Sequence, residues 1–174
     1  WEDTDYDGLM EENRKVDIPK EGQTVLFEPY YLDSQGAWKS VPGGETKKAV
    51  TDQDGLYILE DAQPSVLIEG VRYLAGYRIR LESLDDRYAV TRYQAGAGTG
   101  LAEKDSDLIA ETLYLTKPGE FVTAAEVTEQ ETDYTVTVGN ISYDLRGAAD
   151  SRGGNAGLVP YQDGMLEGII WEDQ

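Results

Sequence analysis

The sequence predicts an all-β sandwich with long loops and at most short helical turns. Short stretches rich in aromatic and β-branched residues recur along the 174 residues, and turn signals separate them. No segment carries apolar residues at helical spacing over the roughly ten residues that a helix needs. Hydrophobic residues make up 40% of the chain, including 12 Tyr, 3 Trp and 2 Phe, which is enough to fill the core of one domain.

Two hairpins are predicted in the first half of the chain. Residues 24–32 are apolar, β-branched and aromatic, and a turn leads from them into the alternating stretch 37–41. A second pair of strands, 48–51 and 56–59, flanks a turn in which Gly55 supplies the positive φ that such a turn requires.

The second half of the chain has more widely spaced strand signals. Residues 77–81 alternate, which places Tyr77, Ile79 and Leu81 on one buried face. The other predicted elements are strands at 88–91, 112–115 and 133–138, helical turns within 9–16 and 103–111, and long connections at 96–100 and 146–164.

Composition and charge restrict the functions that remain open. The chain has 34 acidic and 15 basic residues, a net charge of −19 and a pI near 4.2. Such a polyanion is repelled by nucleic acid and by anionic membrane surfaces, so neither is an expected partner. The absence of Cys and His excludes thiolate chemistry, Ser-His triads and most zinc sites. No carboxylate pair is singled out for catalysis, and we expect a non-enzymatic protein.

The most informative motif is an acidic stretch at the start of the sequence. Asp3, Asp5 and Asp7 alternate and Gly8 follows them, which is typical of a loop that wraps carboxylates around Ca²⁺. In an EF-hand loop the twelfth position carries a bidentate Glu, but that position is Arg14 here. The predicted ligands of this loop are Asp3, Asp5, Asp7, the Leu9 carbonyl, Glu11 and Glu12.

Two further acidic groups are less specific. Asp52 and Asp54 precede Gly55 and are most simply explained as part of a hairpin turn. Asp105 and Asp107 follow a glycine-rich loop, and their spacing fits a helix cap as well as it fits a metal ligand pair.

Several motifs together resemble the B-type repeats of serine-aspartate-repeat adhesins, the SdrD B-like domains, which are related to the CnaB-like domains of Gram-positive surface proteins. These repeats open with Gly-x-Val-Trp-x-Asp-x-Asn-x-Asp-Gly, followed by an Ile-Pro-Gly-Val-x-Val-x-Leu strand. They continue with Thr-Asp-x-Asp-Gly-x-Tyr, a Gly-Tyr-x-Val strand and Asp-Ser-Asp. The matching residues lie at 168–173 and 1–8, at 18–27, at 51–58, at 76–79 and at 105–107.

The resemblance implies a prealbumin-like, Ig-like β-sandwich that serves as a Ca²⁺-stiffened spacer on a Gram-positive cell wall. It also implies that Asp105 and Asp107 join the first loop as metal ligands. Trp1-Glu2-Asp3 recurs at 171–173, so we expect residues 1–167 to form one module and 168–174 to begin the next repeat. The expected partners are therefore adjacent repeats of the same polypeptide.

Residues 108–165 make this module longer than the usual repeat, and the resemblance does not cover them. The alternative function is accordingly an adhesive head that binds a host protein or glycan through the 108–165 region.

Overall fold

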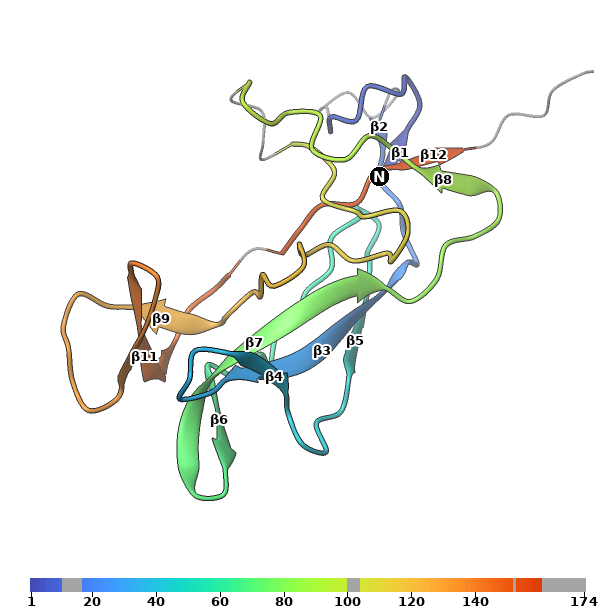
Figure 1. Ribbon diagram of the computed structural model, residues 1–174. Helices are drawn as coiled ribbons and strands as arrows, with labels where there is room; N and C mark the ends of the chain where they lie inside the picture. The colour runs from blue at the N-terminus through green and yellow to red at the C-terminus, as the bar shows by residue number, and fades with distance from the viewer. Residues whose placement is uncertain (11–16, 100–103, 152, 161–174) are drawn as a thin grey trace, which may run out of the picture.

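The computed structural model describes residues 1–10, 17–99, 104–151 and 153–160. These residues form an all-β structure without a helix, as the sequence predicts (Figure 1). The described strands are β1 (Glu2–Asp3), β2 (Asp17–Ile18), β3 (Thr24–Leu32), β4 (Trp38–Ser40), β5 (Lys47–Val50), β6 (Ser65–Ile68), β7 (Val71–Leu81), β8 (Tyr88–Val90), β9 (Ala125–Val127), β10 (Thr135–Val138), β11 (Ile141–Ala148) and β12 (Leu158–Pro160).

The central sheet is built on the two longest strands, β3 and β7, which pair antiparallel over seven residues from Val25↔Leu81 to Tyr31↔Ala75. β4 and β5 pair with the two ends of the other edge of β3, and β6 pairs with the start of β7. Because side chains alternate along a strand, this register places Val25 and Phe27 beside Ile79 and Leu81 on one buried face.

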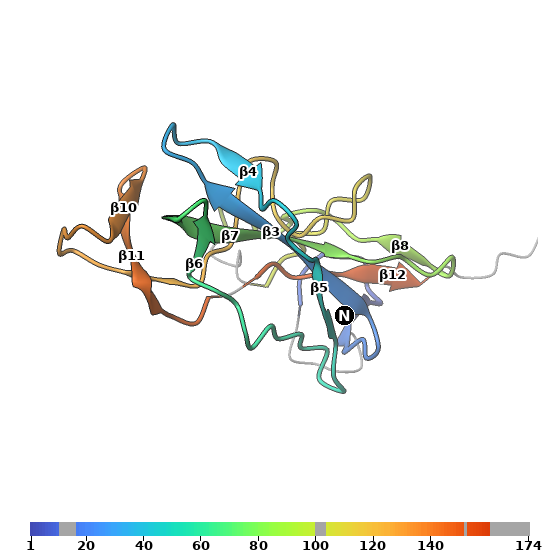
Figure 2. The same cartoon turned by 90° about the horizontal axis from the view of Figure 1, so that it is seen from below.

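Two smaller sheets lie at opposite ends of the central sheet (Figures 1 and 2). One has the order β2-β1-β12-β8, in which β1 pairs parallel with β12 and antiparallel with β2. The other has the order β10-β11-β9, with a register shift in β11 between Asp144 and Ala148. The pairing of β1 with β12 brings residues near both ends of the described chain into one sheet.

Each end of the central sheet has its own apolar cluster. The larger one contains Val25, Phe27, Tyr77, Ile79, Leu81, Leu108, Leu115 and Leu158. The smaller one joins the central sheet to the three-stranded sheet and contains Leu32, Leu74, Ala125 and Leu145. The three-stranded sheet is thus attached to the rest of the molecule through a compact apolar contact.

Most of the predicted strands are confirmed, but two of them are wrong. Residues 56–59 form no strand, because Asp52 N bonds to Leu56 O in a tight turn and Tyr57 then turns inward, its hydroxyl donating to Gly154 O. Residues 112–115 form only isolated bridges beside β7. A single turn begins at Ile109, whose carbonyl accepts hydrogen bonds from Thr112 N and Leu113 N, at the end of the segment 103–111. The helical turn expected within 9–16 lies mostly outside the described residues. The segment 146–164, predicted as a connection, contains β12.

A polar cluster lies on the outer face of the central sheet. Glu28 Oε1 accepts a hydrogen bond from Arg80 Nε at 2.8 Å, and its Oε2 accepts one from the Tyr114 hydroxyl at 2.7 Å. Burial by itself raises the pKa of Glu28, but these two hydrogen bonds and the charges of Arg80 and Arg78 outweigh it and lower the pKa below its ordinary value of 4.5.

The attachment of the three-stranded sheet can be tested with a matched pair of leucines in the β6–β7 hairpin. Leu74 is 1% exposed and Leu67 is 61% exposed. We expect Leu74→Ala to lower the free energy of unfolding by about 2–5 kcal/mol, because it leaves a cavity in the smaller cluster. Leu67→Ala should change it by less than about 0.5 kcal/mol in the same urea titration. Equal effects of the two variants would contradict this packing.

A second prediction concerns acid stability. Because the folded pKa of Glu28 lies below its unfolded value, its contribution is present above the unfolded pKa and is lost as pH falls through the folded pKa. Glu28→Gln should therefore cost about 1 kcal/mol at pH ~7 and have a smaller effect at pH ~3. Glu82→Gln, which removes the exposed pair with Lys48, is the control and should be near neutral at both values. A Glu28→Gln effect independent of pH would refute the linkage.

Candidate metal centre

A buried aspartate organises the loop that follows β1. The Asp3 side chain is 0% exposed. Its Oδ1 accepts a hydrogen bond from Tyr6 N at 2.7 Å, and its Oδ2 accepts one from Gly8 N at 2.9 Å and another from the Thr91 hydroxyl. Three donors compensate the burial of this charge, and the single donor at Oδ1 leaves that oxygen able to bind a further partner.

The loop reverses direction through two residues with positive φ, Tyr6 at 67° and Gly8 at 81°. A Cβ atom on Gly8 would lie 2.8 Å from the Cβ of Arg92 and 2.9 Å from the Cβ of Ala95. Glycine is therefore required at this position both by the backbone conformation and by the close approach of residues 92–95.

Three carboxylates converge at the base of this loop. One oxygen each from Asp3, Asp5 and Asp17 lies within 4.8 Å of the other two. Asp3 and Asp17 are buried and face each other as partners in the antiparallel pair β1–β2, whereas Asp5 is exposed in the loop. This is the one group of three acidic side chains at metal-binding separation in the described part of the chain.

The electrostatics of the cluster favour a cation. Two unit charges at 4.8 Å repel by about 1 kcal/mol in water and by about 3–4 kcal/mol at an effective dielectric constant near 20. The pKa of Asp5 is raised, first by desolvation and then by the neighbouring carboxylates of Asp7 and Asp3. With oxygen donors only, the group fits a hard cation such as Ca²⁺.

Of the other predicted ligands of the first loop, Asp7 is not a member of this group. Asp7 Oδ1 accepts a hydrogen bond from Leu9 N at 2.7 Å, so this carboxylate stabilises the turn. The Leu9 backbone forms an isolated bridge with Asp105. Glu11 and Glu12 lie outside the described residues.

The Asp105–Asp107 segment lies beside the first loop. Met10 N donates to Lys104 O at 2.6 Å next to the bridge between Leu9 and Asp105. Asp105 is 2% exposed, and desolvation followed by the charge of Asp107 raises its pKa. Asp107 Oδ2 accepts a hydrogen bond from Asn155 N at 3.0 Å. Neither carboxylate is a member of the three-carboxylate group, and their role as ligands stays a prediction.

The Asp52–Gly55 segment forms the predicted tight turn, although no strand follows it at 56–59. Asp52 Oδ1 accepts hydrogen bonds from Asp54 N at 2.9 Å and from Leu56 N at 3.0 Å. Gly55 has a φ of 74°.

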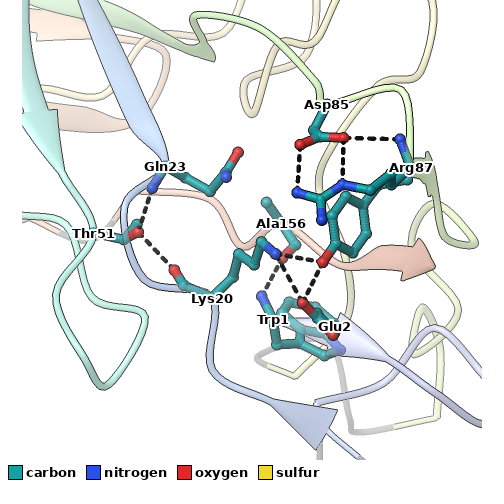
Figure 3. Close-up of polar contacts among 9 residues, drawn as sticks. Trp1, Glu2, Lys20, Gln23, Thr51, Asp85, Arg87 and Ala156 are labelled. Carbon is teal, nitrogen blue, oxygen red and sulfur yellow. Dashed lines mark hydrogen bonds and ion pairs between the residues drawn. The ribbon is translucent and has the colours of Figure 1, made fainter.

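A polar network beside the three-carboxylate group holds the neighbouring strands together (Figure 3). Lys20 forms an ion pair with Glu2 at 2.8 Å, and the Tyr88 hydroxyl donates to the same Glu2 oxygen at 2.6 Å. The Lys20 carbonyl in turn accepts a hydrogen bond from the Thr51 hydroxyl at 2.6 Å. Since Glu2 lies in β1 and Tyr88 in β8, this network fixes the strand that carries Asp3.

The sequence analysis missed Asp17, which the structure places in the cluster. Asp17 lies fourteen positions after Asp3, beyond the loop motif, and it has no acidic neighbour at alternate spacing. Only the antiparallel register of β1 with β2 brings it opposite Asp3. The position of Asp17 directly before Ile18-Pro19 is visible in the sequence, but it does not indicate which carboxylate Asp17 would face.

Comparisons with known proteins found no matching family model, no matching curated protein and no matching solved structure. The described segments also contain no helix with the length and apolarity of a membrane span.

The close packing of the loop can be tested with two glycines that share a positive φ. A Cβ on Gly36 (φ 78°) would meet nothing within 4 Å, whereas one on Gly8 would collide with Arg92 and Ala95. We expect Gly36→Ala to cost about 1 kcal/mol through backbone strain alone. Gly8→Ala should cost about 1–3 kcal/mol more because of the collision. Equal losses in chemical denaturation would show that the loop does not pack against residues 92–95.

Proposed function

We propose that this chain is a non-enzymatic, calcium-binding structural module of a cell-wall-anchored bacterial surface adhesin. The observation that carries the metal part of the proposal is the convergence of carboxylate oxygens from Asp3, Asp5 and Asp17. The motif resemblance described above supports the adhesin part, including a place on the exterior of a Gram-positive cell.

Calcium is the cation that suits this site best. Ca²⁺ takes six to eight oxygen ligands in flexible geometry, and an irregular loop with an exposed carboxylate can supply several of them. Mg²⁺ demands a stricter octahedral arrangement and retains its water more strongly. Extracellular calcium sites commonly have Kd values of about 10⁻⁴–10⁻³ M, so such a site fills outside a cell and empties in the cytosol.

The residues of the cluster give the ion a mechanical role. Asp3 belongs to β1 and Asp17 to β2, while Asp5 belongs to the loop between them. A cation held by all three would cross-link β1, β2 and the loop at the end of the module where β1 enters the sheet. In a tandem array this end would meet the preceding repeat, and a stiffened junction is what a spacer requires.

Thermal unfolding in the presence and absence of calcium tests the metal part of this proposal. An ion that binds only the folded state adds about 2.7 kcal/mol at a concentration about 100-fold above Kd. For a domain of this size the melting temperature should rise by about 5–10 °C, and a chelator should reverse the rise. Mg²⁺ at the same concentration should have a smaller effect.

Matched variants distinguish calcium binding at this site from a general screening of the negative charge by calcium. Asp17→Asn should abolish most of the calcium-dependent rise, whereas Asp86→Asn, which neutralises an exposed acid outside the cluster, should preserve it. If neither calcium nor a chelator changes the melting temperature of the native chain, and calorimetry detects no calcium binding, the proposal is wrong. The adhesin part is tested separately by the parent polypeptide, in which a cell-wall sorting signal and further repeats are expected.

A further inference from the structure

The outer face of the central sheet carries a concentration of aromatic and arginine side chains that calcium binding does not explain. β3 and β7 direct Glu28 and Tyr30 to this face together with Arg78 and Arg80, opposite to the buried face described above. The strands that form this face, β3 and β7, are separated in sequence from the acidic loop that follows β1.

Residues from the 108–165 region complete this face. The gold segment that leads into β9 runs along β7 (Figure 1). Leu115 N bonds to Ile79 O at 2.7 Å, and Val122 exchanges two hydrogen bonds with Tyr77 at 2.8 and 3.0 Å. These contacts place Tyr114 and Phe121 next to Arg80 and Arg78.

Three half-buried rings pack against one another and are called the aromatic row, defined as Tyr30, Trp38 and Phe121. The ring centroids of Trp38 and Phe121 lie 4.5 Å apart at an interplanar angle of 24°, and those of Tyr30 and Phe121 lie 4.8 Å apart. Trp38 lies directly over Gly76, where a Cβ atom would be 2.5 Å from Cζ3 of the indole. The row is therefore built by side chains from three separate segments.

Arg78 lies beside the aromatic row without a carboxylate partner. Its guanidinium is 3.7 Å from the ring centroid of Tyr114 and 5.9 Å from that of Tyr30. Both oxygens of the nearby Glu28 are already engaged by Arg80 and Tyr114. Among the described residues no ion pair forms with Arg78, and its Nε is buried without a hydrogen-bond partner. Stacking on Tyr114 fixes the guanidinium, and its two terminal nitrogens, which form no hydrogen bond or ion pair with the described residues, can donate to a ligand.

We propose that this face binds an acidic glycan, with a sugar ring on the aromatic row and its carboxylate paired with Arg78. A carboxylate matches the planar fork of a guanidinium, and the apolar face of a pyranose matches an aromatic ring. β3 and β7, the strands that carry Tyr30 and Arg78, are paired on both sides, so a peptide could add a strand only at an edge strand such as β4. This assignment gives part of the 108–165 region an adhesive role and does not rest on calcium binding.

The test is a titration of the native chain with trigalacturonic acid, with galactotriose as the neutral counterpart, followed by NMR in chelator and again in calcium. We expect the acidic sugar to shift the signals of Trp38, Tyr114 and Phe121, and the neutral sugar to shift them far less. Binding should weaken as salt is added, since one charge pair is formed.

Variants then assign the contacts. Arg78→Gln should weaken binding about tenfold or more, and Phe121→Leu should weaken it as well, whereas Arg87→Gln, an exposed arginine paired with Asp85, should leave it unchanged. The proposal is overturned if the native chain shows no shifts, or if Arg78→Gln binds as tightly as the native chain. It is likewise overturned if a tetraglutamate peptide shifts the same signals and the acidic sugar does not.

Discussion

The antiparallel pairing of β3 with β7 is the constraint on which the remaining structure depends. Its register assigns Val25, Phe27, Ile79 and Leu81 to one face. A slip of one residue would exchange the two faces and expose the larger apolar cluster to water. Every other sheet, and the segment that carries Tyr114, is placed by contacts with this pair or with the core beneath it.

The second constraint is electrostatic, because the molecule buries carboxylates at one end of its core. Asp3 is compensated by three hydrogen-bond donors, and the adjacent β1–β2 register brings Asp17 against it. Concentrating like charges in this way is unfavourable unless a cation neutralises them. The cluster and the outer face with Arg78 thus differ in sign and in the ligand chemistry that each favours, and they lie on different sheets.

Local sequence was sufficient to predict the strands and turns that depend on neighbouring residues. Alternation and a following turn predicted β3 and β4 almost to the residue, and the Asp52–Gly55 turn formed as its composition indicates. It failed at 56–59, where a strand pattern is overridden because Tyr57 turns into the core. It also failed at β12, a three-residue strand in a glycine-rich stretch, because that strand exists through its pairing with β1 and β8.

The same distinction applies to the candidate metal centre. The spacing of Asp3, Asp5 and Asp7 before Gly8 was by itself enough to predict a turn lined by carboxylates, because Asx turns and positive φ are properties of neighbouring residues. Which carboxylates meet was decided by the tertiary structure. Strand register brought Asp17 opposite Asp3, since convergence depends on the pairing of segments that sequence spacing does not encode, whereas Asp7 is engaged by a local hydrogen bond from Leu9 N.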